Sequence, residues 1–490
     1  MAASVQLQHA SHAPGNPDQL VRQQEPLNTE PYTDRLDQSF ITPTNLVFHR
    51  NHDSVVDKKA PSSALAATWK LSFSVDASVQ DAKLCSLSAH SWNIESIQKD
   101  YGHHEVVATL ECAGNRRAEF SSATSESRSN LKSKPPPEGI QWGNAVIANV
   151  IWGGASMREI LLSAGVPDPY SHHAASELAQ LSPSDGAIQR DAAGWSQPLH
   201  LHLLSVQESS ESDDPTRIEL FGASIPLATA MHPNQSCLVA YRHNREPLLQ
   251  CHGAPLRAVV PGHAGARWIK WLAGLKVSAH VNASPPMRQD YKLLVPPSSK
   301  SNQPSSDSAM TDEEWINKAS HDPAFRQAKL DEAKPLQRLE SNSSITQPWR
   351  SGTELSTKDS HITVKGYAVG QDGWPVDHVY VALVSDPGSE IISEDLLDSL
   401  PEDTTWVEAK LQNQADDVTL EPDSRPNWSW AWTLWQVQLP VKGVDGPFAL
   451  IAKCVTANGI EQERISAWNL RGFCNRSWPV VRNLSLQSAQ

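Results

Sequence analysis

The segment from residue 105 to residue 117 constrains the chain more than any other, and it reads EVVATLECAGNRR. Its first half is apolar and β-branched, which predicts a buried strand. The strand should end near Cys112, because small and turn-forming residues follow it. Two arginines then surround the thiol with positive charge, and nearby guanidiniums favour a thiolate, the form that acts as nucleophile or metal ligand. On composition alone, Cys112 would more often be a small buried hydrophobic residue.

The six residues at 112–117, Cys-Ala-Gly-Asn-Arg-Arg, resemble the signature of the sulfite oxidase family. Members of that family are molybdenum-cofactor enzymes, and they include the assimilatory nitrate reductases. The resemblance implies that Cys112 is the one protein ligand to molybdenum, a role that suits a soft thiolate on a redox metal. It also implies that Arg117 lines an anion pocket.

A second family string, Phe-His-Arg-Asn-His, occupies residues 48–52. Taken alone, such a string is typical of a polar surface turn. The resemblance implies instead that the whole string contacts a pterin and that Arg50 also faces the substrate. The implied contacts are Phe48, His49, Arg50, Asn51 and His52.

Later stretches resemble the family in the same order along the chain. Trp142, in the run Gly-Ile-Gln-Trp, would be the pocket tryptophan, whereas we expect Trp152 to pack in the core. Between residues 221 and 275, glycine-rich turns and cationic side chains suit a bulky cofactor with a phosphate tail. The contacts implied there are His252, Arg257, Trp268, Ile269 and Lys270.

Individual residues complete the implied pocket. Tyr291, in Arg-Gln-Asp-Tyr-Lys, corresponds to a tyrosine that reaches the active site in sulfite oxidases, where a phenol can hydrogen-bond an oxyanion. Arg471, in Trp-Asn-Leu-Arg-Gly, would extend into the pocket from the second domain. Composition alone would make the tyrosine an interdomain packing residue and the arginine a sheet-edge residue. The family also has an acidic cofactor contact before the string at 222–226, and this chain is one residue longer there. Asp213 is therefore the predicted contact, and Asp214 remains the alternative.

We expect an α+β chain with four regions. Residues 1–40 are polar and predict a disordered N-terminal tail. Residues 41–295 would form the family's mixed α/β molybdopterin-binding oxidoreductase domain. Residues 296–338 predict a linker or insertion with a surface helix, since Thr311 and the acidic residues after it suit a helix N-terminus. Residues 339–488 contain about seven short strands, which predicts an all-β immunoglobulin-like sandwich and, by the resemblance, a dimerisation domain.

Bulk properties limit the partners and the compartment. The chain has 490 residues and a formal net charge of −14, which argues against a nucleic-acid binder. No apolar run approaches the roughly 20 residues that span a bilayer, and neither a secretory signal nor a terminal Ser-Lys-Leu address is evident. The 6 cysteines form no CxxC pair, which indicates a reducing compartment. We therefore expect a cytoplasmic or mitochondrial protein that binds no membrane.

The activity implied by the resemblance is oxidation of sulfite to sulfate at molybdenum held by molybdopterin. Arg50, Arg117 and Arg471 would bind the oxyanion, because guanidinium donors diverge in a fixed plane. Tyr291 and Trp142 would complete the pocket. No haem or flavin domain is recognisable in the sequence, so we expect an external electron acceptor, dioxygen or a cytochrome, and a homodimer. Two alternatives remain open: a nitrate reductase-like molybdoenzyme and a catalytically degenerate cofactor-binding protein.

Overall fold

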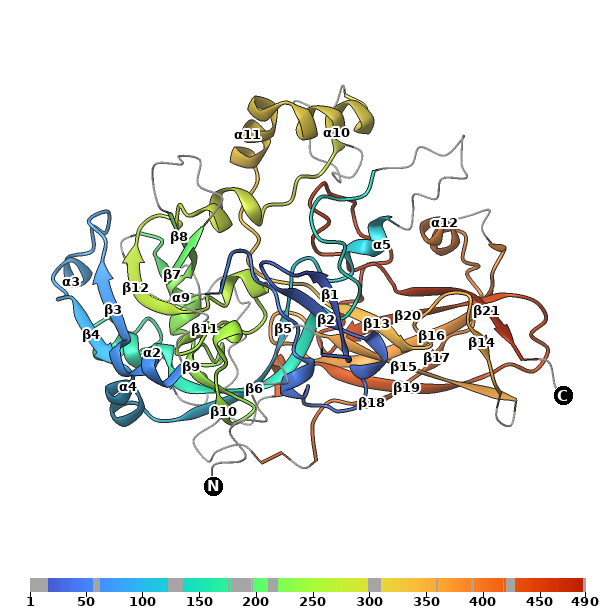
Figure 1. Cartoon of the computed structure of the whole chain (residues 1–490), viewed down its shortest axis with the longest axis horizontal. Coiled ribbons are helices and arrows are strands. Elements are labelled where there is room, and N and C mark those ends of the chain that lie inside the picture. The colour runs from blue at the N-terminus through green and yellow to red at the C-terminus, as the bar shows by residue number, and fades with distance from the viewer. Residues whose placement is uncertain are drawn as a thin grey trace.

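The computed structural model describes residues 16–55, 62–121, 135–174, 177, 195, 197–209, 219–297, 310–357, 360–388, 392–416, 418–419 and 428–487. A mixed α/β unit built mostly from the first 290 residues and a C-terminal β-sandwich lie side by side along the long axis of the molecule (Figure 1). The α+β fold class predicted from the sequence is confirmed.

Two sheets build the α/β unit. One is antiparallel, in the order β10–β9–β6–β5 with β11 paired to β9, and the other follows the order β4–β3–β12–β7–β8. In the second sheet, β12 runs parallel to β3 and antiparallel to β7. The strands are β3 (Lys70–Val75), β4 (His90–Asn93), β5 (His104–Glu111), β6 (Ile147–Ser156), β7 (His200–Ser209), β8 (Glu219–Pro226), β9 (Leu238–His243), β10 (Glu246–Pro247), β11 (Arg257–Val259) and β12 (Leu272–Ser278).

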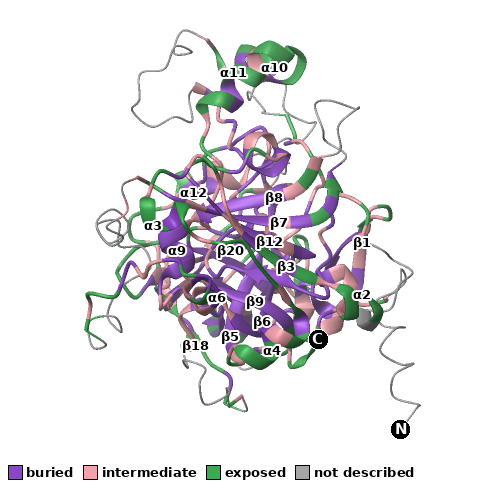
Figure 2. Cartoon of the chain, turned by 90° about the vertical axis from the view of Figure 1, so that its left-hand side faces the viewer, coloured by how far each residue is buried: buried purple, intermediate pink, exposed green. Residues whose placement is uncertain are grey.

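Short helices and turns cover these sheets. They are α2 (Ser62–Thr68), α3 (Ala82–Cys85), α4 (Ile94–Asp100), α5 (Arg117–Ser121), α6 (Met157–Ser163), α9 (Leu227–Met231), the 3₁₀ turns η2 (Thr44–Leu46), η3 (Gln250–His252) and η4 (Gly265–Arg267), and the π-helical turn η5 (Pro286–Asp290). All five residues of α9 are buried, whereas α4 carries exposed residues (Figure 2). Within the described ranges, every helix is too short or too polar to cross a lipid bilayer.

Strand β5 confirms the strand predicted at 105–111. Seven of its eight residues, from Glu105 to Glu111, are buried, because alternate apolar side chains pack on both faces of the sheet. It pairs with β6 in an antiparallel register that sets Leu110 opposite Ala148. The chain leaves the sheet after Glu111, so the residue that follows the strand lies at the end of β5, where it packs with the apolar core.

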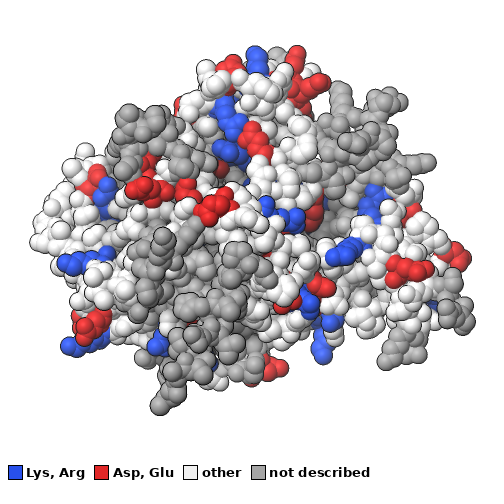
Figure 3. All heavy atoms as spheres, in the orientation of Figure 1, with Lys and Arg blue, Asp and Glu red and all other residues white. Residues whose placement is uncertain are grey.

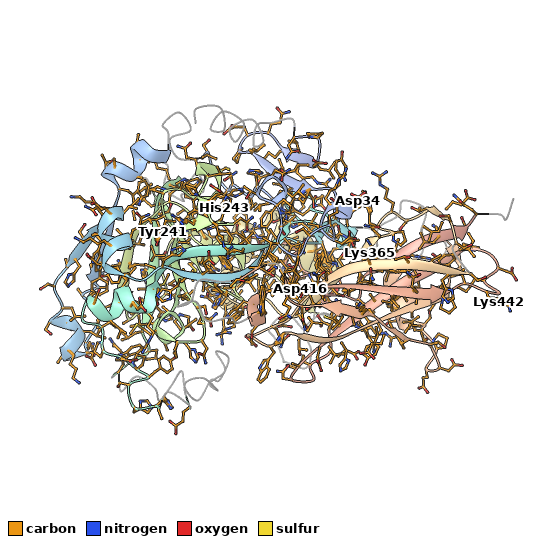
Figure 4. The ribbon with its side chains drawn as sticks, turned by 90° about the horizontal axis from the view of Figure 1, so that it is seen from below. Asp34, Tyr241, His243, Lys365, Asp416 and Lys442 are labelled. Carbon is orange, nitrogen blue, oxygen red and sulfur yellow. The ribbon has the colours of Figure 1, made fainter. Side chains whose placement is uncertain are left out.

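The C-terminal unit is a sandwich of two sheets, in the orders β13–β15–β19–β18 and β14–β21–β20–β16–β17. Aliphatic side chains such as Val364, Val437 and Leu450 fill the space between them. Lys365 lies near the junction with the α/β unit, and Lys442 lies at the outer end (Figure 4). The elements are β13 (Asn342–Gln347), β14 (Glu354–Leu355), β15 (His361–Val369), β16 (Val376–Ser385), α12 (Ser393–Asp398), β17 (Val407–Glu408), β18 (Lys410–Gln412), η8 (Trp428–Trp430), β19 (Thr433–Pro440), β20 (Phe448–Thr456) and β21 (Val480–Leu486).

The prediction of a disordered tail over residues 1–40 is wrong from residue 16 onward. Strand β1 (Gln19–Gln23) pairs with β2 (Asn28–Pro31), and the turn η1 (Thr33–Arg35) follows. Phe40 is 4% exposed and packs with residues of both units. Polar composition misled because polar side chains serve here as partners of buried backbone groups. The Glu30 carboxylate, for example, accepts from Gly143 N–H at 2.9 Å. Residues 1–15 lie outside the described part.

The prediction of a single surface helix between residues 296 and 338 is also wrong. Two helices, α10 (Asp312–His321) and α11 (Pro323–Glu332), form a hairpin at the top of the molecule (Figure 1). Thr311 caps α10 in a capping box with Glu314, as the sequence indicated. One face of the hairpin is buried, however, since Trp315 packs with Phe120 and Trp468 in one apolar cluster. The hairpin therefore joins both units of the molecule.

Candidate active site

A hollow lies where the end of β5 meets the loop at 48–52, the turns between 251 and 270, and Tyr291. About 680 Å³ of the space there is free of protein atoms, its opening to solvent included. Ten of the residues implied by the family resemblance line it. They are Phe48, Arg50, His52, Cys112, His252, Arg257, Trp268, Ile269, Lys270 and Tyr291.

The wall also contains residues that the sequence did not single out: Leu110, Gln207, Phe221, Cys251, Gly265 and Ala266. Cys251 precedes the predicted contact His252, so its position along the chain was a usable signal. Gln207 lies within an irregularity in the register of β7 with β8, between Leu204 and Glu208. A bulge changes which face of the sheet the side chains occupy, so the alternation of apolar and polar residues along β7 could not have predicted the direction of this side chain.

Cys112 stands where β5 ends. Its backbone N–H donates to the carbonyl of Val146 at 3.0 Å, and the chain then turns, with the N–H of Asn115 donating to the Cys112 carbonyl at 2.9 Å. The N–H of Gly114 donates to Cys112 Sγ at 3.4 Å. The residue is only 6% exposed and lines the hollow. The backbone therefore fixes its sulfur at the wall, in a place where a soft ligand could reach a metal.

Lys270 and Arg257 make one corner of the hollow cationic. Lys270 Nζ donates to the carbonyls of Arg50 and Cys251, both at 3.1 Å, and to Asn51 Oδ1. Burial, and then the charge of Arg257, lower the pKa of Lys270 to about 7. Arg257 donates to the carbonyls of His252 at 3.0 Å and Trp268 at 3.2 Å. Burial lowers its pKa to about 9, which leaves it charged at neutral pH.

This corner suits an anionic group such as a phosphate. Arg257 Nε is buried and has no hydrogen-bond partner among the described residues, and a buried donor of this kind is costly unless something accepts from it. His49, Cys251 and His252 bring ligand atoms within 4.8 Å of one another and could hold a cation by ligand type. Burial raises the pKa of Cys251 to about 11, so its thiol is protonated and a poor ligand. The neighbouring cations therefore favour an anion there.

Arg117 is held in a cradle of three glycines. Its Nε donates to the carbonyl of Arg471 at 2.9 Å and its Nη1 to that of Ile140 at 2.7 Å. A Cβ at Gly114 would lie 2.8 Å from Nη2, one at Gly139 3.1 Å from Nη1, and one at Gly472 2.6 Å from Cγ. Only glycine leaves room for the guanidinium at these positions. Burial lowers the pKa of Arg117 to about 10, so it stays charged.

Arg117 lies behind the wall of the hollow rather than on it. Its ionisation is nevertheless coupled electrostatically to Cys112, Arg50, Tyr291 and Arg471. Arg471, predicted to extend into the pocket, does not line the hollow either; its Nη2 donates to the carbonyl of Gln289 at 3.4 Å. The structure therefore brings together the thiol, the phenol and three arginines from four distant parts of the chain.

The remaining residues implied by the resemblance lie deeper or elsewhere. Trp142 is 1% exposed, and a Cβ on Gly114 would come within 3.1 Å of its Cδ1, so it packs beneath the arginine cradle. His49 Nδ1 hydrogen-bonds Thr29 Oγ1 at 2.9 Å, and Asn51 Nδ2 donates to the carbonyl of Leu27 at 2.7 Å. Both support the wall from behind. Asp213 and its alternative, Asp214, lie outside the described residues.

A buried polar network occupies the opposite side of the β5 terminus. Asn115 and Asn342 each donate to Glu111 Oε1 at 2.9 Å. Arg116 Nη1 donates to Asn342 Oδ1 at 2.8 Å and to the carbonyl of Ser477 at 2.7 Å. Burial raises the pKa of Glu111, against the hydrogen bonds from both asparagines. Since Asn342 and Ser477 belong to the sandwich, this network fastens the two units together directly behind Cys112.

Comparison with known proteins matches both halves of the chain. The family model described as "Oxidoreductase molybdopterin binding domain" matches residues 60–285, and the one described as "Mo-co oxidoreductase dimerisation domain" matches residues 333–483. The chain is 28% identical over 468 residues to "Sulfite oxidase, mitochondrial" of Homo sapiens, covering 95% of this chain and 66% of that protein, just under two thirds of its length.

A plant relative and one solved structure extend the match over nearly the whole chain. "Sulfite oxidase" of Arabidopsis thaliana is 28% identical over 479 residues, which cover 97% of this chain and 96% of that protein. The crystal structure of the sulfane dehydrogenase SoxCD from Paracoccus pantotrophus has a TM-score of 0.57 and 17% identity over 94% of this chain and 87% of that chain. That second likeness is one of fold.

Proposed function

Since this chain belongs to the sulfite oxidase family of molybdopterin oxidoreductases, we propose that it oxidises sulfite to sulfate. One observation carries the proposal: Cys112, Arg50 and Tyr291 line the same hollow. A soft metal ligand, an anion-binding guanidinium and a neutral hydrogen-bond donor are what oxidation of a small oxyanion at a metal requires.

The residues of the hollow fit a pterin-bound molybdenum. Cys112 would supply the thiolate ligand, and the cationic corner at Arg257 and Lys270 would hold the phosphate of the pterin. Phe48, His52 and the turn at 268–270 would contact the rest of the cofactor. When bound, the molybdenum cofactor supplies two-electron oxygen-atom transfer, which no amino-acid side chain can perform.

Four side chains would bind or attract the oxyanion. Arg50, on the wall, offers fixed, diverging donors to its oxygens. Arg117, whose Nε and Nη1 donate to backbone carbonyls behind the wall, would act through its positive charge. Burial raises the pKa of Tyr291 to about 12, so the phenol stays protonated and can donate a hydrogen bond to an anionic oxygen. Arg471 adds positive charge from the C-terminal unit. In a largely buried site these charges act at low dielectric, where they stabilise an anion more strongly than in water.

The reaction would need an electron acceptor, and the protein would pair with a second copy of itself. The two electrons removed from sulfite would pass to an external acceptor, dioxygen or a cytochrome. The dimerisation-domain match supports a homodimer. All six cysteines are free thiols, which is consistent with a reducing compartment such as the cytoplasm or the mitochondrion.

Purification with metal analysis, followed by two assays, tests the proposal. Sulfite-dependent reduction of ferricyanide is the expected result, in a protein that contains molybdenum. Formation of nitrite from nitrate with a viologen donor, without sulfite turnover, would assign the nitrate reductase-like chemistry instead. Bound molybdenum with neither activity would mark a degenerate cofactor-binding protein and contradict the proposal.

A further inference from the structure

The α10–α11 hairpin is attached to segments that carry the implied oxyanion ligands. Leu294 and Leu470 pack in the same apolar cluster as Leu330 of α11. Lys292, next to Tyr291, donates from Nζ to the carbonyl of Leu330 at 2.6 Å. The hairpin thus contacts the chain just after the phenol and immediately before Arg471.

An ion network links the hairpin to Arg471 itself. Arg326, on α11, donates from Nη1 to Glu138 Oε1 at 2.9 Å and from Nη2 to Glu138 Oε2 at 2.7 Å. Arg471 Nη1 lies 3.9 Å from the same Oε2. Basic and acidic side chains lie next to one another on the hairpin at the top of the molecular surface (Figure 3). Glu138 is therefore shared unequally, with Arg326 holding both of its oxygens.

Glu138 also sits beside the arginine cradle. Its N–H donates to the carbonyl of Leu470 at 2.8 Å, and a Cβ on the next residue, Gly139, would meet the Arg117 guanidinium. Burial opposes ionisation of Glu138, yet the hydrogen bonds and charge of Arg326, together with the charge of Arg471, hold its pKa below the ordinary value. A negative charge thus stands next to a site that must attract an anion.

With both oxygens of Glu138 held by Arg326, the carboxylate charge is compensated there, and Arg471 Nη1 stays 3.9 Å away, beyond hydrogen-bond distance. If Arg326 were absent, Glu138 could turn to Arg471 and form that bidentate pair there. Arg471 would then have both its charge and two of its donors compensated, and it would bind an oxyanion less well. Occupation of Glu138 by Arg326 keeps Arg471 available.

We propose that Arg326 and Glu138 are positioning residues for the oxyanion site, and that the α10–α11 hairpin sets substrate affinity by holding Glu138 away from Arg471. This inference rests on the proposed function, because it concerns the same oxyanion. It assigns the hairpin a role in specificity that its place between the two units did not suggest.

Three variants of the holoenzyme test the arrangement. Arg326→Gln should raise the KM for sulfite roughly 10-fold with kcat within about 2-fold, because binding and not chemistry is affected. Glu138→Gln should leave KM unchanged or lower it. The double variant should behave like Glu138→Gln, since without the carboxylate the loss of Arg326 no longer matters. Arg158→Gln breaks a comparable ion pair with Asp168, at 2.6 Å, and is the matched control with unchanged KM.

Binding of inorganic sulfate, measured by calorimetry on the same proteins, supplies a readout that does not depend on turnover. The dissociation constant should rise roughly 10-fold in Arg326→Gln and return in the double variant. An equal rise in the Glu138→Gln background, or no rise at all, overturns the inference while sulfite oxidation by the wild type stands. A wild-type holoenzyme that neither turns over sulfite nor binds sulfate removes the proposed function and this inference together. Far-ultraviolet circular dichroism shows whether each variant is folded.

Discussion

The two sides of the β5 terminus have opposite electrostatic designs. On the front side, Cys112 lines a hollow that also contains Arg257. Among the described residues, Arg257 Nε has no hydrogen-bond partner. On the back side, Asn115 donates to Glu111 and to the hydroxyl of Tyr367, and Arg116 donates to Asn342 of the sandwich. The front can therefore bind an anion, whereas the back stabilises the interface between the two units. Buried polar groups can bind a ligand where their hydrogen-bond donors are unused, and they stabilise the structure where those donors are paired within the protein.

The adjacent arginines of the motif show how one string serves both sides. Arg116 has a left-handed backbone, with φ of 64°, which turns the chain so that consecutive side chains diverge. Arg116 is fully buried and reaches Asn342 and the carbonyl of Ser477 in the sandwich. Arg117 turns to the glycine cradle and the site. Identical side chains therefore have different roles, one in docking and one in anion binding.

The largest expected effect comes from Cys112→Ser, which changes one atom on the front side. Activity with sulfite should fall by at least 10³-fold, because oxygen is a poor substitute for a thiolate on molybdenum. Stability should change by less than about 1 kcal/mol, since the volume is nearly conserved. Turnover with sulfite and urea unfolding of the same preparation check both statements. Normal turnover would remove the assigned role of the thiol.

Exchanging each arginine for glutamine separates the two sides most clearly. Arg117→Gln should raise the KM for sulfite roughly 100-fold, through loss of a buried positive charge close to the anion. Arg116→Gln should lower the free energy of unfolding by about 3 kcal/mol, because buried partners such as Asn342 lose their donor, with a smaller effect on KM. Steady-state kinetics and chemical unfolding of both variants are the measurements. If both variants changed KM alike, the division into front and back would be wrong.

The pH dependence of anion binding tests the cationic corner. Lys270, with a pKa of about 7, is charged below that pH and neutral above it, so anion binding takes up a proton at higher pH. Affinity of the cofactor-free protein for sulfate, which does not titrate in this range, should fall roughly 10-fold from pH 6 to pH 8. Lys270→Met should bind more weakly and show a flat profile. A sloping profile in that variant would assign the titration to another group.

Two glycines provide the subtlest comparison. Gly472 and Gly352 both have positive φ, of 57° and 75°, so alanine strains either backbone by about 1 kcal/mol. A Cβ at Gly472 would meet Arg117 Cγ at 2.6 Å, whereas a Cβ at Gly352 would have nothing within 4 Å. Gly472→Ala should therefore raise the KM for sulfite several-fold, and Gly352→Ala should leave it unchanged. Similar KM values in the two variants would show that the cradle does not position Arg117.

The sequence predicted most of the wall of the hollow and less of what stands behind it. Cys112, Arg50 and Tyr291 lie in strings that resemble the sulfite oxidase family, and that resemblance, not their residue types, indicated their place in the pocket. Gln207 could not be placed, because the bulge in β7 resets the alternation of faces. Trp142 and Arg117 were expected on the wall but lie behind it, since their depth depends on the docking of the sandwich against the strand end and not on the local sequence.

Order in the N-terminal segment and the hairpin could not be predicted for a related reason. Both have few apolar residues, and those few bury only against partners far along the chain. Phe40 packs in a cluster with Trp432, and Trp315 in one with Trp468. Local composition therefore indicated a tail and a surface helix, whereas tertiary contacts decide the structure of each.

X-ray absorption at the molybdenum edge tests the central claim most directly, namely that the sulfur of Cys112 is bonded to the metal. The measurement counts sulfur neighbours of molybdenum in the purified wild-type holoenzyme and in Cys112→Ser carrying the same cofactor. The account predicts one sulfur neighbour fewer in the variant. An equal number in both proteins would contradict it.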